Sequence, residues 1–141
     1  MTGDSRARIE EEGVLNMTIA FIEESNAGTR TLPRSLATQA GGFVFVSGQV
    51  ARDDNGELVA GGIEAQTRQT MKNVAHALAL AGCTLEDVVK TTVWLDDARD
   101  FDAFNRVYGE FFPGKKPARS TAQVRNVVGT KVEIEAVAYR P

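Results

Sequence analysis

The residues between Gly61 and Gly82 carry the longest periodic pattern in the chain, and this pattern restricts the fold more than any other feature. Apolar or small side chains recur there at three- and four-residue spacing, which predicts one amphipathic helix. Gly82 is suited to end that helix, because glycine readily takes the left-handed conformation that follows many helices. Such a helix must bury its apolar stripe against another element, so the flanking segments decide the fold class. The stripe consists of Ile63, Thr67, Thr70, Met71, Val74, Leu78 and Ala81.

Segments typical of strands lie on both sides of this helix. They are rich in β-branched and aromatic residues and are separated by turn residues. Residues 43–46 are apolar at every position, which predicts a central strand covered on both faces. Asn55-Gly56 predicts a hairpin turn. In the first strand after the helix, Val89, Thr91 and Val93 are expected to share one face. The expected strands are residues 18–22, 42–50, 57–59 and 88–95, a strand that begins at Arg119, and residues 131–139.

A second amphipathic helix is expected between Phe101 and Phe111, where Phe104, Val107 and Tyr108 complete a second apolar stripe. The predicted order is therefore strand–strand–strand–helix–strand–helix–strand–strand. This order indicates an α+β fold, with one mixed β-sheet and two helices on one face. The other face would be uncovered. Its apolar residues, some of Phe43 to Val46 and Val93 among them, predict an oligomer that packs sheet against sheet.

The 141 residues fit one domain, which we expect to span residues 17–141. Residues 1–16 are polar and charged, so a mobile N-terminal extension is expected there, with Met17 as a plausible alternative start. A net charge of −3 without a run of Lys and Arg argues against a nucleic-acid-binding protein. No apolar segment approaches the ~18 residues of a membrane span, and no secretory signal is visible. With Cys83 as the only cysteine, these features favour a reducing, cytoplasmic setting.

Three other features resemble chemical sites but have simpler interpretations. His76, the only histidine, falls on the polar face of the first helix and is expected to be solvated. Cys83 is expected to be a small buried residue, because no histidine accompanies it as a base. Asp96, Asp97 and Asp100 could suggest a metal site. A charged entrance to the second helix is the preferred interpretation, since acidic residues favour a helix N-terminus.

The segment Lys116–Thr121 and the last strand carry the candidate site. Pro117 ends any preceding helix, and Arg119 then begins a strand from which its guanidinium can hold a carboxylate with two hydrogen bonds. Glu133 lies on the following strand and could face the same space. On residue chemistry alone, the two residues are also compatible with an ordinary ion pair at the surface.

From about residue 30 to its end, the chain resembles the Rid family of reactive enamine/imine deaminases, also known as YjgF/YER057c/UK114. The spread and order of the matching stretches make this resemblance specific, whereas residues 1–16 lie outside it. The stretches are Phe45–Gln49, Gln66–Gln69, Asp87–Val93, Asn105–Tyr108, Pro117–Ser120 and Val132–Ala136.

The resemblance implies a chorismate-mutase-like α+β fold and a homotrimer with ligand pockets in the clefts between subunits. It implies hydrolysis of 2-imino acids and 2-aminoacrylate-type enamines to 2-keto acids and ammonia, a metabolite damage-control activity of the 2-iminobutanoate/2-iminopropanoate deaminase type. Neither a cofactor nor a metal is implied. By the resemblance, Arg119 holds the substrate carboxylate and Glu133 positions or activates water. The implied pocket-lining residues are Ser47, Gly48 and Asn105, with Thr121 standing where some members have cysteine.

One departure from the family pattern concerns the pocket. The common Pro-Tyr-Ser reads Pro33-Arg34-Ser35 here, so Arg34 replaces a tyrosine that lines the pocket. If Arg34 points inward, we hypothesise a substrate with an additional anionic group; if it points outward, the substrate range is broader.

Two other functions remain as alternatives. One is a trimer that binds small carboxylates without turnover. The other is an endoribonuclease, which the acidic charge and the lack of a histidine pair disfavour.

Overall fold

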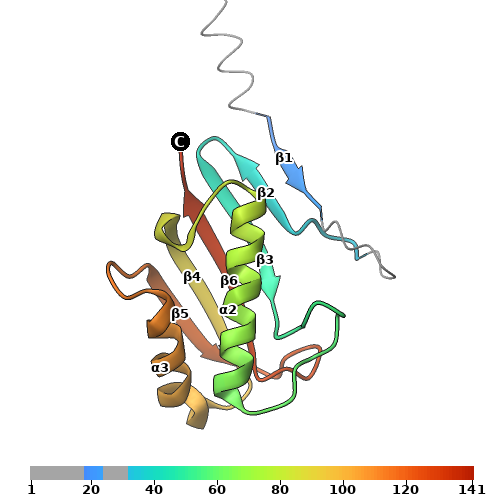
Figure 1. The fold of residues 1–141 in the computed structure, drawn as a ribbon, viewed down its shortest axis with the longest axis vertical. Helices are drawn as coiled ribbons and strands as arrows, with labels where there is room; N and C mark the ends of the chain where they lie inside the picture. Colours follow the sequence, from blue (N-terminus) through green and yellow to red (C-terminus); the bar gives the residue numbers. More distant parts are fainter. Residues whose placement is uncertain (1–17, 24–31) are drawn as a thin grey trace, which may run out of the picture.

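The computed structural model describes residues 18–23 and 32–141 of the chain (Figure 1). Six strands form one mixed sheet in the order β1-β2-β3-β6-β4-β5. All neighbouring strands are antiparallel except β4 and β5, which run parallel. The elements are β1 Ala20–Ile22, β2 Ala37–Ala40, β3 Phe43–Gln49, α2 Ile63–Leu80, η1 Leu85–Asp87, β4 Val88–Leu95, η2 Ala98–Asp100, α3 Phe101–Phe111, β5 Ala118–Gln123 and β6 Val132–Tyr139.

Helices α2 and α3 lie side by side across one face of the sheet (Figure 1). The predicted α+β class, with one sheet and two helices, is therefore confirmed in the described residues. The hydrophobic core fills the layer between these helices and inward-facing residues such as Val44, Val93 and Ile134. The described helices include none that is both long and apolar enough to cross a membrane. The predicted mobile extension at residues 1–16 and the predicted turn at 25–28 lie outside the described residues.

Helix α2 matches its predicted stripe. Ile63, Met71 and Val74 are buried together with the stripe threonines, and Gln66 and Ala77 join them. Gly82 has φ of 77°, and it ends the helix with the two hydrogen bonds of a Schellman motif. The Gly82 amide donates to the Ala79 carbonyl at 3.0 Å, and the Cys83 amide donates to the Leu78 carbonyl at 2.8 Å. The predicted helix and its end at Gly82 are therefore confirmed.

The early strands differ from the prediction. Residues 57–59 form no strand and contribute only an isolated bridge between Arg52 and Leu58. The additional strand is β2, whose sequence Ala-Thr-Gln-Ala carries little strand preference of its own. It is extended because it pairs along its whole length with β3, across a tight turn in which Gly41 has φ of 58°. Tertiary pairing, rather than local propensity, makes this strand.

The two faces of the sheet also differ from the prediction at three points. The side chains of Phe43 and Phe45 are 44% and 46% exposed, so β3 is covered on one face only in a single subunit. A register shift between Val88 and Lys90 leaves Val89 exposed and Val88 buried, because a bulge changes which side chains face the core. Val93 is fully buried beneath the helices and does not belong to the exposed face. On the exposed face, the rings of Phe43 and Tyr139 pack against each other at a tilt of 49°, with 4.9 Å between their centroids.

Candidate functional site

Arg119 lies half-buried on the helix-covered face of β5, the strand at the edge of the sheet. It is paired in register with Thr91 of β4, whose side chain faces α3. The guanidinium carbon of Arg119 lies 5.6, 5.4 and 4.8 Å from the ring centroids of Phe101, Phe104 and Tyr108. These distances are typical of cation–π interactions. Among the described residues, no carboxylate forms an ion pair with Arg119, so its positive charge is held by aromatic rings alone.

Helix α3 brings these rings together because residues three, four and seven apart share one helix face. Asn105 lies on the same face, half-buried, one turn after Phe101. The Tyr108 hydroxyl and the Thr91 hydroxyl form a buried hydrogen bond of 2.7 Å, which fixes the Tyr108 ring against the sheet. Burial raises the pKa of Tyr108, so this ring stays neutral beside Arg119. We call Arg119, Phe101, Phe104, Asn105, Tyr108 and Thr121 the Arg119 cluster.

A cavity with a volume of about 260 Å³ adjoins the Arg119 cluster. It is lined by Leu95, Ala98, Phe101, Thr121, Ala122 and Gln123. Thr121 follows Arg119 by two positions on β5, so the two side chains project from the same face of the strand. Phe101 belongs both to the cavity wall and to the rings around the guanidinium. A ligand held by Arg119 therefore has an open space directly beside it.

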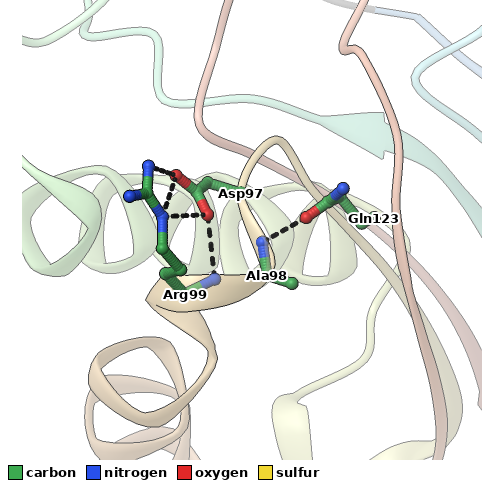
Figure 2. Close-up of polar contacts among 4 residues, drawn as sticks. All are labelled: Asp97, Ala98, Arg99 and Gln123. Carbon is green, nitrogen blue, oxygen red and sulfur yellow. Dashed lines mark hydrogen bonds and ion pairs between the residues drawn. The ribbon is translucent and has the colours of Figure 1, made fainter.

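The corner before α3 forms one wall of this cavity and is held by side chains on both sides (Figure 2). The Ala98 amide donates a hydrogen bond of 2.6 Å to the side-chain carbonyl of Gln123 on β5. Asp97 accepts a hydrogen bond of 2.9 Å from the Arg99 amide and pairs with the Arg99 guanidinium at 2.7 Å. The Arg99 hydrogen bonds lower the pKa of Asp97 to about 2. Asp97 thus caps the helical turn, as expected for a charged helix entrance.

Glu133 lies on the opposite, exposed face of the sheet. Its neighbours Val132 and Ile134 are buried beneath the helices, and it pairs in register with Trp94. The Glu133 carboxylate packs against the backbone of Gly48: a Cβ atom at Gly48 would lie only 2.6 Å from Oε2 of Glu133. No side chain larger than glycine therefore fits at this position without moving the carboxylate.

Ser47 and Arg34 complete this second group. The Ser47 hydroxyl donates a hydrogen bond of 2.6 Å to the Ser35 carbonyl, which ties the segment that carries Arg34 to β3. Burial, with a smaller contribution from Glu135, raises the pKa of Glu133, whereas the positive charge of Arg34 lowers it. The Arg34 side chain itself is exposed. We call Arg34, Ser47, Gly48 and Glu133 the Glu133 cluster.

The two clusters do not meet within one subunit. Arg119 faces α3, whereas Glu133 projects from the other side of the same sheet. The interpretation that both residues face one space is therefore wrong for a single chain, and so is an ion pair between them within that chain. The reason is the strand register: Arg119 lies opposite Thr91, whose side chain points inward, and Glu133 lies opposite Trp94, which has the other orientation.

The simpler interpretations of the two other reactive residues agree with the structure. His76 is exposed on α2. Cys83 is buried, and burial raises the pKa of its thiol, which disfavours the reactive thiolate. The sequence did not reveal that Phe101, Phe104 and Tyr108 surround Arg119. Their spacing indicated the stripe of a helix, but only the parallel pairing of β4 with β5 brings Arg119 beneath that stripe.

Comparisons with known proteins agree on one group. The family model described as Endoribonuclease L-PSP matches residues 29–140. A 2-iminobutanoate/2-iminopropanoate deaminase of Mus musculus is 44% identical over 110 residues, covering 77% of this chain and 82% of that protein. A RutC family protein of Pyrococcus horikoshii is also 44% identical, with 77% and 87% covered. The crystal structure of the Rid-family protein YyfA from Yersinia pestis has a TM-score of 0.81 at 38% identity, with 86% and 99% covered. That of E. coli TdcF with bound serine has a TM-score of 0.79 at 35% identity and the same coverage.

Proposed function

Because the chain belongs to the YjgF/Rid family, whose model is described as Endoribonuclease L-PSP, we propose that it is a deaminase that hydrolyses 2-imino acids to 2-keto acids and ammonia. Enamines of the 2-aminoacrylate type are substrates once they tautomerise to imines. The proposal rests mainly on the surroundings of Arg119. This half-buried cation packs against aromatic rings and lies beside a cavity. The name of the mouse relative, a 2-iminobutanoate/2-iminopropanoate deaminase, and the serine bound to E. coli TdcF support this class of ligand.

Arg119 binds the substrate carboxylate in this proposal. Its guanidinium offers two parallel N–H groups, which match the two oxygens of a carboxylate. A charge-assisted hydrogen bond of this kind contributes on the order of 1.5–3 kcal/mol. The rings of Phe104 and Tyr108 restrict the guanidinium to one orientation, so little side-chain freedom is lost when the substrate binds.

Glu133 acts on the water. Its carboxylate orients a water molecule and accepts a proton as the water oxygen attacks the C=N carbon. The resulting carbinolamine carries a hydroxyl and an amino group on one carbon. Proton transfer to the nitrogen and loss of ammonia then leave the 2-keto acid. A protonated imine is already electrophilic, so these steps require no further electrophile, and the barrier to be lowered is modest.

In this proposal the site combines two subunits, since Arg119 and Glu133 lie on opposite faces of one sheet. We propose a homotrimer in which the exposed sheet faces, with Phe43, Phe45 and Tyr139, pack inside the assembly. The Arg119 cluster of one subunit then meets the Glu133 cluster of the next. The assembly itself is measured by analytical ultracentrifugation, and a monomer at micromolar concentration would contradict it.

The activity is tested with an amino acid oxidase that generates a defined imine while semicarbazide traps it. A deaminase competes with the trap and lowers the semicarbazone signal. Suppression in proportion to added protein supports the proposal. Tight binding of 2-keto acids without any suppression would instead favour a carboxylate-binding protein without turnover.

Replacing Gly48 by alanine is expected to lower kcat/KM about 10- to 100-fold, because the added methyl group displaces the Glu133 carboxylate from its position. The thermal midpoint should change little, since the displaced atoms belong to a flexible side chain. Gly109→Ala is the matched control: it adds the same methyl group on α3, where nothing lies within 4 Å. Equal activity of the two variants would show that the placement of Glu133 against Gly48 does not matter for turnover.

The pH dependence should report on Glu133. Only its carboxylate form accepts a proton, so kcat/KM falls as the pH is lowered through its pKa, which is raised above the ordinary value. Arg34→Tyr removes a charge that lowers this pKa, so the acid limb should move to higher pH. The protonation of the imine is common to both proteins and cancels in the comparison. Lys72→Tyr, which removes an exposed charge on α2, serves as the control. An acid limb that stays in place or moves to lower pH would exclude this role of Arg34.

A further inference from the structure

Tyr108 differs from its neighbours in the aromatic stripe of α3 by a single hydroxyl group. Phe104 lies one turn before it and Phe112 one turn after it, and both rings pack against the Tyr108 ring, with 5.4 and 5.0 Å between centroids. All three side chains are buried. A phenylalanine at position 108 would fill the same space without bringing a polar group into the core. Hydrophobic packing therefore does not account for the hydroxyl.

Thr91, the partner of this hydroxyl, is also an exception in its surroundings. It lies fully buried on β4 and forms the 2.7 Å hydrogen bond with Tyr108. The next inward-facing residues of the strand, Val93 and Leu95, are apolar. Valine has nearly the same shape as threonine, so the packing of β4 does not require this hydroxyl either. Two apolar surfaces thus each carry one polar group, and the two groups meet.

Thr91 and Arg119 are neighbours across the sheet. They are paired in register on β4 and β5, strands that lie about 4.8 Å apart, and both side chains face α3. The Tyr108 ring contacts both of them. Its hydroxyl reaches Thr91, and its centroid lies 4.8 Å from the guanidinium carbon of Arg119, closer than either phenylalanine ring of the cluster. The ring nearest to the cation is therefore also the ring that is bonded to the sheet.

We propose that Tyr108 and Thr91 are positioning residues for Arg119. Their hydrogen bond holds the Tyr108 ring in one place, and the ring fixes the direction in which the guanidinium meets the substrate carboxylate. The proposal rests on the proposed role of Arg119 in carboxylate binding. A displacement of about 1 Å in a catalytic site can lower a rate about 100-fold. Loss of the bond alone, with the ring still present, should lower kcat/KM about tenfold.

Single variants test the bond. Tyr108→Phe keeps the ring without its hydroxyl, and Thr91→Val keeps the shape of the threonine without its hydroxyl. Each should lower kcat/KM for imine hydrolysis about tenfold in the semicarbazide assay. Each should also lower the thermal midpoint, because it leaves the other hydroxyl buried without a partner. Thr91→Ser retains a hydroxyl and should recover most of the activity that Thr91→Val loses.

Thr70→Val is the matched control for these variants. Thr70 is as fully buried as Thr91, but its hydroxyl has no hydrogen-bond partner among the described residues. The same exchange of a hydroxyl for a methyl group therefore breaks no bond there. Thr70→Val should retain wild-type activity, and a tenfold loss in this variant as well would contradict a specific role of the Thr91 bond.

The double variant Thr91→Val/Tyr108→Phe separates positioning from stability. Removing both hydroxyls leaves no unpaired polar group, so the thermal midpoint should return close to the wild-type value. The activity should remain about tenfold low because the ring has lost its anchor. The two single losses should not multiply, since both variants remove the same bond. Recovery of activity together with the thermal midpoint would overturn the proposal, because the pair would then serve stability alone.

A second double variant tests whether the pair acts through Arg119. Arg119→Ala/Tyr108→Phe should be no less active than Arg119→Ala alone, because no guanidinium is left for the ring to orient. A further tenfold loss would contradict positioning of Arg119. The same variants also report on carboxylate binding without turnover. Calorimetric titration with pyruvate, a stable keto acid product, should give about threefold weaker binding to Tyr108→Phe than to wild type.

Two results distinguish the positioning pair from the deaminase function. Imine turnover by a fully active Thr91→Val/Tyr108→Phe variant would overturn the pair and leave the deaminase in place. Weaker pyruvate binding by Tyr108→Phe, without turnover of any imine by the wild type, would support the pair and overturn the deaminase.

Discussion

The Arg119→Ala variant is expected to lose about 100-fold in kcat/KM for imine hydrolysis while it keeps its fold. The variant removes the guanidinium that binds the substrate carboxylate in the proposed mechanism, so both affinity and orientation should be lost. Arg119→Lys should lose about tenfold, because an ammonium group is a point charge that cannot form two parallel hydrogen bonds. Folding should survive since the guanidinium is half-buried and makes no ion pair among the described residues.

The measurement compares kcat/KM of the variants in the semicarbazide competition assay, with thermal midpoint and sedimentation as checks on folding and assembly. Arg68→Ala is the control, because it removes an arginine whose ion pair with Glu110 lies on the outer surface of the helices. Arg68→Ala should retain wild-type activity. If Arg119→Ala hydrolysed imines as fast as wild type, Arg119 would have no role in substrate binding.

Mixing two inactive variants, Arg119→Ala and Glu133→Gln, should restore activity. Each site of the proposed ring takes its arginine from one subunit and its glutamate from the next. Every mixed trimer then contains one site in which both residues are native. Equal amounts of the two variants, co-expressed or refolded together, should therefore recover about a quarter of wild-type activity. Each variant alone should stay near 1% of that activity, which is the level expected for a loss of about 100-fold.

The control for this experiment mixes Arg119→Ala with the double variant Arg119→Ala/Glu133→Gln. Subunits exchange in the same way, but no site can regain Arg119, so no recovery is expected. A pair of residues that acted within one subunit would give no recovery in the first mixture either. Activity that remained at the level of the separate variants would thus disprove the shared site.

The sequence predicted the two helices, whose periodicity is strong. It did not predict the features that depend on how the strands pair. Helix α2 and its glycine end followed from a 3.6-residue stripe, and the helix α3 stripe was equally clear. Strand β2 was missed, because Ala-Thr-Gln-Ala becomes a strand only through its pairing with β3. The orientation of Val89 was wrong because a bulge shifts the register by one residue, and patterns of alternation cannot show where a bulge occurs.

The candidate site shows the same limit. Arg119 and Glu133 were identified by their resemblance to a family motif, and the structure places them with an aromatic cluster and with Gly48, respectively. The face of the sheet on which the Arg119 side chain lies could not be predicted. It depends on whether β5 pairs parallel with β4 and on the register of that pairing, and one residue of slip reverses every side chain of a strand. The cavity could not be predicted either, since it forms where β5 meets the corner at residues 97–99.

The two halves of the proposed site differ in how far apart their residues lie along the chain. The rings, Thr91 and Arg119 all come from the continuous stretch β4–α3–β5, so they can assemble through contacts between near neighbours in sequence. Glu133 meets Gly48 only when β3 pairs with β6, which closes a loop containing most of the domain. Closing a longer loop costs more chain entropy, and such pairing is slow. The half proposed to bind the carboxylate is therefore organised locally, whereas the half proposed to activate water depends on the longest chain closure in the sheet.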